Sequence, residues 1–510
     1  MTTEYTLKSV DGEWVNPTGG RRKIKTHWNL EGDAQSVLTN VKKMLNDTLP
    51  IHNKNVKEIN ALFSIFFNHQ KIETEKTKEQ RSDINNKDSI ADAYKAVRTI
   101  NSYCFGEPLL YIANDMNKQG FVETLNKLLK YRHNHKENIN ATLNSSICGV
   151  GYKTSLPAKR GYAPFKISGD IRPQDAYVVY NDEMVSEKVA GVYISTSYDK
   201  DGNEDGTIYT IWTNDYQFIL KDKKDNDKKG YERFEVVQQM VLNKPAIAYP
   251  LVNKMIPLIE IPRNSFRLGD FEMAITLFDI KNKVMNNRLD DIQQIVDYLL
   301  VLINCKFEDD KEKKEILTKR LLSLEVVDPN NKPSVEILKN ALDQSGIQQF
   351  AEYIDTLIQE ILGIPSRQER GGGGGDTGQA VRFRNGFRDL ENNAGMITPE
   401  MESAELEFIE LCLTYCNDRE KLGLGDLTSI DVNIKFRRTF NDDVVSTSQA
   451  FSTFVKAGMS PVDALTASKA VPDADEVAKR CVPVIEYISV AKESDSKDNS
   501  KKEKENEPQE

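Results

Sequence analysis

The fold is decided by the stretch Ile259-Glu260-Ile261-Pro262-Arg263-Asn264-Ser265-Phe266-Arg267-Leu268-Gly269-Asp270-Phe271-Glu272. Its first residues end a segment with the two-residue period of a β-strand. Asp270 is a good helix N-cap, and Glu272 adds a carboxylate to the first turn. Apolar residues then recur at helical spacing as far as Val296. The stretch therefore predicts a strand, a polar turn and a long helix with one apolar stripe.

The chain before this stretch divides into a helical part and a strand part. Helical spacing of apolar residues runs over 34–93, with a polar interruption at 76–87, and further helices are predicted at 96–105 and 121–142. From about 175 to 260 the period changes to two, and Asp201-Gly202 predicts a hairpin turn between two strands. We expect helices followed by antiparallel β-structure.

The first 30 residues show no periodicity, but they contain the basic run Arg21-Arg22-Lys23-Ile24-Lys25. Such runs are usually solvated loops, and contact with nucleic acid is the alternative. We expect a solvated arm.

The chain after the long helix returns to a second helix through a mixed insertion. The pattern predicts a strand at 298–307, a charged helix at 309–322 and short strands at 324–327 and 335–338. Ser345 and Gln348 form a capping box that begins the second helix. The pattern therefore predicts two long helices joined by a small α/β insertion.

Five consecutive glycines, Gly371 to Gly375, follow the second helix. Glycine loses the most backbone entropy on ordering, so this segment must be mobile or held by its neighbours. Another helix follows Thr377, and Pro399 either kinks it or starts a new helix that reaches about Cys416. A strand at 430–440, small helices at 444–456, 461–470 and 473–488, and a disordered charged end complete the expected order.

Composition excludes several classes of protein. Apolar residues make up 39% of the chain and charged residues 29%, which is typical of soluble globular proteins. There is no apolar run of about 20 residues, as a membrane helix needs, and the polar start does not resemble a signal peptide. Six scattered cysteines fit a reducing compartment. The net charge of −10 argues against a protein that grips duplex DNA by neutralising many phosphates.

Enzyme and metal sites find little support in the sequence. Asp376-Thr377-Gly378 matches the aspartic-protease triplet but lacks the apolar strand that would hold it, and no Gly-Lys-Ser/Thr follows the glycines to make a phosphate loop. His133 and His135 do not share a helix face, while Cys412 and Cys416 do and are interpreted as two buried thiols. We expect no catalytic residues, no cofactor and no metal.

Three segments resemble the portal proteins of tailed phages with long non-contractile tails. They are Tyr103-Cys104-Phe105-Gly106-Glu107-Pro108, the opening stretch as it runs into Leu277-Phe278-Asp279-Ile280, and Asp376-Thr377-Gly378-Gln379-Ala380-Val381-Arg382-Phe383. They occur in the order found in that family, over about 33–488. The five glycines and Pro399 depart from the family pattern.

This resemblance implies an α+β portal fold. Its expected parts are an N-terminal arm (1–32), a wing of helices and then antiparallel β (33–268), stem helix 1 (269–296), a small α/β clip (297–344), stem helix 2 (345–363), a tunnel loop (364–379), a wing helix and strand (380–440), a helical crown (441–490) and a disordered charged tail (491–510).

The resemblance also implies a function. A homo-oligomeric ring, typically dodecameric, would form at one capsid vertex of the virion after assembly in the host bacterial cytoplasm. It would be the conduit for double-stranded DNA during packaging and ejection, with transient contacts that are not sequence-specific. The implied partners are the large terminase, a head-completion or adaptor protein, and the major capsid and scaffolding proteins, with no membrane. The alternatives are a packaging-associated enzyme and a monomeric head-completion adaptor.

Three sets of residues are candidate sites, each with a simpler alternative. The tunnel-loop arginines would face DNA or pair with nearby acids such as Glu369, the stem residues would pack between subunits or inside one, and the clip cations would dock the motor or be a solvated face. The sets are Arg367, Arg370, Gly371, Gly372, Gly373, Gly374, Gly375 and Asp376 in the tunnel loop; Phe271, Ile275, Phe278, Leu289, Ile292, Ile347, Phe350, Ile354 and Ile358 in the stem; and Lys311, Lys313, Lys314, Lys319 and Arg320 in the clip.

Overall fold

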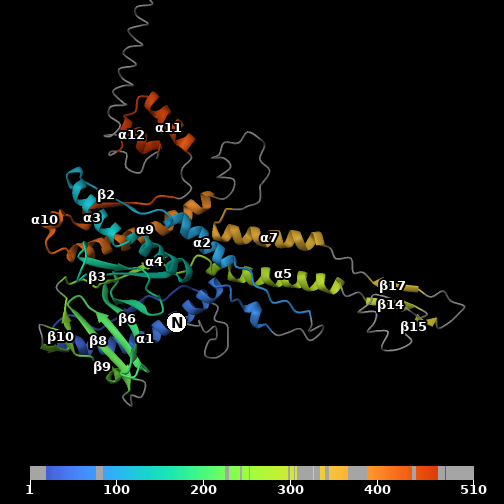
Figure 1. Cartoon of the computed structure of the whole chain (residues 1–510), viewed down its shortest axis with the longest axis horizontal. Coiled ribbons are helices and arrows are strands. Elements are labelled where there is room, and N and C mark those ends of the chain that lie inside the picture. The colour runs from blue at the N-terminus through green and yellow to red at the C-terminus, as the bar shows by residue number, and fades with distance from the viewer. Residues whose placement is uncertain are drawn as a thin grey trace, which may run out of the picture. The chain divides into compact units, whose positions relative to one another are not determined.

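The computed structural model of the chain combines helices and β-sheets (Figure 1), which confirms the α+β expectation. Its contacts divide the chain into two compact units. The first comprises Met1–Phe63, Lys95–Glu272 and Gly363–Glu510, and the second Ser64–Tyr94 and Met273–Leu362. The structure describes residues 19–75, 84–223, 229–241, 244–251, 253–296, 299–303, 305–306, 325–326, 334–338, 344–365, 387–438, 444–468 and 477.

The first unit contains a seven-stranded sheet in the order β1-β5-β6-β7-β8-β12, with β9 paired to β8. Strands β5 to β8 form an antiparallel meander, and Gly202 takes a φ of 85° in the predicted hairpin turn between β6 and β7. The strands are β1 (Ile24–Thr26), β5 (Ala176–Asn181), β6 (Lys188–Tyr198), β7 (Glu204–Trp212), β8 (Tyr216–Lys223), β9 (Glu235–Val236) and β12 (Tyr249–Pro250).

Helix α1 (Ala34–Phe66) supplies the core that covers one face of this sheet. Its buried side chains Val41, Met44 and Leu45 belong to one cluster with Val192 and Ile211 of the sheet. Residues at every second strand position point to the same face, so the helix covers the apolar side chains that alternate along the strands.

A smaller sheet lies under two helices of the same unit. Its order is β13-β3-β4, and helices α4 and α9 pack on it. Its strands are β3 (Val150–Pro157), β4 (Phe165–Ser168) and β13 (Leu258–Pro262), and the helices are α4 (Asn134–Cys148) and α9 (Phe387–Thr414). Further elements are α2 (Asp92–Phe105), β2 (Leu110–Ala113), η2 (Met116–Lys118), α3 (Gln119–Tyr131), η3 (Gly230–Arg233), β10 (Gln239–Val241), β11 (Lys244–Ala246), α10 (Arg419–Leu422), η5 (Ser429–Asp431), β18 (Val432–Lys435), α11 (Val444–Lys456) and α12 (Pro461–Ser468).

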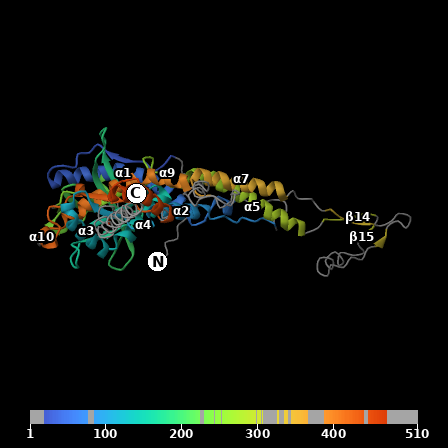
Figure 2. The same ribbon diagram turned by 90° about the horizontal axis from the view of Figure 1, so that it is seen from above.

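The second unit is built on two long helices that lie side by side in both views (Figures 1 and 2). They are α5 (Ile275–Val296), which follows the turn η4 (Glu272–Ala274), and α7 (Gln344–Leu362). The unit also contains η1 (Lys71–Thr74) and two antiparallel strand pairs. These are β14 (Leu299–Ile303) with β17 (Ser334–Leu338), and β15 (Cys305–Lys306) with β16 (Glu325–Val326).

Three expectations differ from the structure. The basic run is not a solvated loop, because Arg21 is buried and Ile24 begins β1, which pairs in parallel with β5. The helix predicted at 121–142 is two helices, separated at His133, whose φ of 56° is left-handed and breaks the helical path.

Pro399 does not start a new helix, since α9 continues through it. The hydroxyl of Thr398 donates to the carbonyl of Ala394, next to the carbonyl of Gly395 that Pro399 leaves without an amide donor.

Among the described residues, no helix has the length and apolar character that crossing a membrane requires.

Candidate functional site

The turn between β13 and η4 is held by a buried ion pair. Arg263 is 1% exposed, and its Nε and Nη2 each lie 2.6 Å from an oxygen of the Asp270 carboxylate. A buried guanidinium needs an anion beside it, so Asp270, which the sequence predicts as a helix cap, instead binds Arg263. The amide of Gly269 donates to Glu272 at 2.6 Å, which closes the turn before the helix.

The buried basic run is anchored on this turn. The amide of Arg21 donates to the carbonyl of Arg267 at 3.0 Å, and its guanidinium pairs with Glu272 at 2.9 Å and Glu58 at 3.3 Å. Burial raises the pKa of Glu272, and the adjacent Arg21 opposes that rise. A Cβ on Gly20, whose φ is 76°, would lie 1.8 Å from the carbonyl oxygen of Phe266, so only glycine fits this approach.

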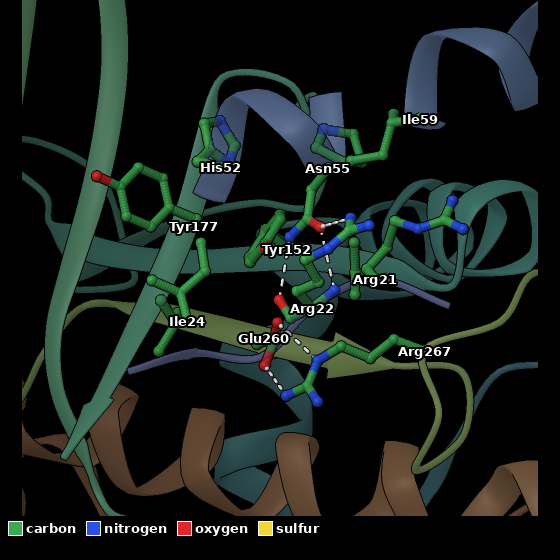
Figure 3. Close-up of a pocket in the computed structure, with 13 residues that line it drawn as sticks. Arg21, Arg22, Ile24, His52, Asn55, Ile59, Tyr152, Tyr177, Glu260 and Arg267 are labelled. Carbon is green, nitrogen blue, oxygen red and sulfur yellow. Dashed lines mark hydrogen bonds and ion pairs between the residues drawn. The ribbon is translucent and has the colours of Figure 1, made fainter. Parts of the chain in front are cut away.

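A small polar pocket lies beside the anchored run (Figure 3). Its lining includes Arg22, His52, Tyr152, Glu260 and Arg267, and it has room for about one water molecule. His52 stacks on Tyr177, and burial lowers its pKa to about 4. A pocket this small fits a packing seam rather than a site for an organic ligand.

A second buried ion pair fastens α9 to the smaller sheet. The Nζ of Lys153 lies 2.7 and 3.0 Å from the two carboxylate oxygens of Glu405, and 3.3 Å from the centre of the Phe408 ring. Tyr111 donates to the same carboxylate at 2.7 Å. Burial lowers the pKa of Lys153, while Glu405 opposes that shift. The network is structural, and no spacing in the sequence marks it.

Helices α5 and α7 of the second unit are joined by polar contacts along their length. Lys281 of α5 pairs with Asp355 of α7 at 2.5 Å and with Asp92 at 2.8 Å. Arg288 donates to Gln348 at 2.5 Å, one further contact between the helices. These contacts place the two predicted stem helices next to each other as one antiparallel pair.

The predicted stem residues divide between buried and exposed positions. Leu289, Ile292 and Phe350 are 38%, 42% and 50% exposed. Ile347 is partly buried. The remaining five are buried, and the first of them belongs to the first unit: Phe271, Ile275, Phe278, Ile354 and Ile358.

Each helix carries an exposed apolar face. The α7 face consists of the exposed residues Phe350, Tyr353 (58% exposed) and Ile361 (51% exposed) and the half-buried Leu357 between them. Their spacing of three, four and four residues places them on one side of the helix. The α5 face consists of Met285, Leu289 and Ile292, each between 38% and 42% exposed. The sequence analysis did not identify Tyr353, although a residue three positions after Phe350 lies on the same side of a helix.

A third side of the helix pair is polar and already occupied. The side-chain oxygens of Asn282, Asn286 and Asp290 accept hydrogen bonds from three alternate backbone amides, those of Ile90, Asp88 and Asn86, at 3.0, 2.8 and 2.9 Å. Four residues of helix rise about 6 Å and two residues of extended chain about 6.6 Å, so the two spacings match. We call Asn282, Asn286 and Asp290 the polar ladder. The sequence signal was three Asn or Asp residues at intervals of four.

The predicted thiols and metal sites have clear outcomes where the structure describes them. Cys412 and Cys416 are buried, and their sulfurs donate to Ser155 and to the Cys412 carbonyl. The interpretation as two buried thiols is confirmed. Within the described part of the chain, no three His, Cys, Asp or Glu side chains gather in a way that would hold a metal ion.

The tunnel-loop and clip candidates lie outside the described residues. They are Arg367, Arg370, the five glycines, Asp376, Lys311, Lys313, Lys314, Lys319 and Arg320.

A family model described as phage portal protein, SPP1 Gp6-like, matches residues 45–507, which include described parts of both units. A search of curated proteins finds no match.

Proposed function

The chain belongs to the phage portal protein family, and on that premise we propose that it forms a ring at one capsid vertex through which double-stranded DNA is packaged and ejected. The membership confirms the resemblance found in the sequence. Portal proteins are structural components rather than enzymes, which disfavours the packaging-enzyme alternative.

The observation that carries the proposal is the pair of exposed apolar faces on one helix pair. A closed cyclic ring repeats a single heterologous interface, so each subunit must present two different surfaces that fit each other. The α7 face (Phe350, Tyr353, Leu357, Ile361) and the α5 face (Met285, Leu289, Ile292) meet this requirement. Contiguous apolar surface of this kind usually marks an interaction site.

The parts of the proposed ring follow the chain order. Helices α5 and α7 would be the stem, residues 297–344 the clip, 364–379 the tunnel loop, and α11 and α12 part of the crown. We propose twelve subunits as the typical number, with the clip exposed to the large terminase and later to the head-completion protein. Arg367 and Arg370 would touch passing DNA only transiently, because many tight phosphate contacts would slow its movement.

The proposed ring is tested by electron microscopy of the purified full chain. The wild type should show rings with a central hole. Replacing Phe350 and Tyr353 by Asp should yield folded monomers, because carboxylates on the α7 face would be buried without partners when the ring closes. A matched control is Ile430→Asp, at an exposed apolar residue of the first unit, and it should still form rings. A wild type that remains monomeric would instead favour the adaptor alternative.

A further inference from the structure

One part of the chain has a charge opposite to that of the whole. Over residues 124–169 there are eight Lys and Arg residues and one acid, Glu137, in a protein whose formal net charge is −10. One of the eight, Lys153, is buried and paired with Glu405. The remaining seven cations lie on α3, on α4, in the turn between these helices and on the β3–β4 hairpin.

Two of these elements are fastened to each other at the surface. The Nη2 of Arg132, just after α3, donates to the carbonyl of Ala163 at 2.6 Å and to that of Arg160 at 3.3 Å, both in the hairpin loop. The rings of Tyr131 and Tyr162 meet edge to face with centroids 5.7 Å apart. The end of α3 and the hairpin loop therefore present one continuous surface.

Four of the cations on this surface are exposed and form no ion pair within the described part of the chain. Lys130, Lys159, Arg160 and Lys166 are exposed, and none of them forms an ion pair with another described residue. Glu137, the one acid of 124–169, accepts a hydrogen bond from the amide of Gly169 at 2.8 Å and pairs with Lys136 at 3.9 Å, while Arg132 is half-buried. We call the six cations Lys130, Arg132, Lys136, Lys159, Arg160 and Lys166, with Tyr131 and Tyr162, the basic patch.

Two tyrosines, Tyr131 and Tyr162, lie among these cations and are exposed. Exposed phenol groups beside lysines and arginines also suit contacts to phosphate oxygens.

We propose that the basic patch binds the phosphate backbone of duplex DNA without sequence specificity, at a site separate from the tunnel loop. Clustered Lys and Arg on one face are the electrostatic footprint of nucleic-acid binding, even in an otherwise acidic protein. The binding itself does not require a ring, but the choice of DNA over another polyanion rests on the proposed function. The small number of cations makes the contact weak at physiological salt, which suits DNA that must keep moving.

The test uses the full-length protein and a covalently closed circular DNA, which cannot be threaded through a preformed ring. Binding is measured between 50 and 200 mM salt, and electron microscopy records separately whether rings are present. The patch variant replaces Lys130, Lys159, Arg160 and Lys166 by Gln. The matched control replaces four exposed lysines elsewhere in the first unit by Gln, namely Lys54, Lys57, Lys200 and Lys421.

Wild type and control should bind the circle with the same affinity, and four phosphate contacts predict a loss of roughly 100-fold over this salt range. The patch variant should bind at least about 10-fold more weakly at 50 mM salt, with a log–log salt slope smaller by about 3 to 4. Equal binding by the patch and control variants would overturn the inference, whether or not rings form. The inference would also be overturned if the patch variant lost binding to anionic vesicles or polyglutamate but bound DNA as well as the wild type does.

Discussion

The polar ladder on α5 makes a sharp prediction for Asn286→Ala. This side chain is 5% exposed, accepts from the amide of Asp88 at 2.8 Å, and donates to the carbonyls of Asp88 and Asn282 at 2.7 and 2.8 Å. The variant removes all three bonds, of which the two to Asp88 hold the segment and the third lies within α5. At about 1 kcal/mol net for each of the two, the segment beside α5 loses about 2 kcal/mol of its stability against local opening.

Amide hydrogen exchange measures this loss directly. Exchange through local opening scales with the opening equilibrium, so the amides of Asn86, Asp88 and Ile90 should exchange roughly 30 times faster in the variant. The matched control is Thr276→Ala, at an exposed position near the start of α5, and it should leave these rates unchanged. Exchange at Asp88 that is already fast in the wild type, or unchanged in Asn286→Ala, would refute the proposed match between the spacing of the ladder residues on α5 and the spacing of the amides in 86–90.

Three further predictions concern the first unit. Glu405→Ala should destabilise the first unit by about 3 to 5 kcal/mol, because Lys153 would be left buried without its partner. The double variant Glu405→Leu, Lys153→Met should recover most of this loss in chemical denaturation. A Glu405→Ala variant as stable as the wild type would contradict the prediction. For His52, burial lowers the folded pKa to about 4 from an ordinary 6.5, so the unfolded chain takes up a proton that the folded chain does not. Stability should therefore fall by about 3 kcal/mol as pH drops from 6.5 to 4, and His52→Gln should abolish this dependence in denaturation curves measured across that range. Gly20→Ala should lower the melting temperature, because its Cβ would meet the carbonyl of Phe266 and the left-handed backbone disfavours alanine; an unchanged melting temperature would argue against the anchored basic run.

The parts of the fold that were predicted correctly depend on local signals. The strand, turn and helix of 259–296 follow from spacing and capping residues that are close in sequence, and so does the hairpin at Gly202. The role of Asp270 was missed because a capping residue and an ion-pair partner look alike until the position of Arg263 is known. Strand β1 was missed because three residues show no periodicity and its partner, β5, lies more than a hundred residues away in the sequence.

The candidate site shows a different limit. Phe278 and Leu289 both fit the apolar stripe of one helix, yet the first is 1% and the second 38% exposed. Hydrophobic spacing identifies which side of a helix avoids water, but it does not say whether the cover comes from the same subunit or from another. Whether the same subunit covers a given residue of α5 depends on how far α7 extends along α5, and that is set by long-range contacts of the fold.

The three sides of the helix pair bear on how subunits can meet. The polar ladder is satisfied by residues 86–90 of its own chain, so a neighbour that docked there would have to displace those hydrogen bonds. Docking on the α5 and α7 apolar faces would break none of these hydrogen bonds. It would be favourable, because it removes exposed apolar surface from water. Subunits should therefore associate through the two apolar faces while the ladder keeps its own segment in place. In the proposed ring, the ladder would therefore leave the two apolar faces for neighbouring subunits, while it holds residues 86–90 along α5.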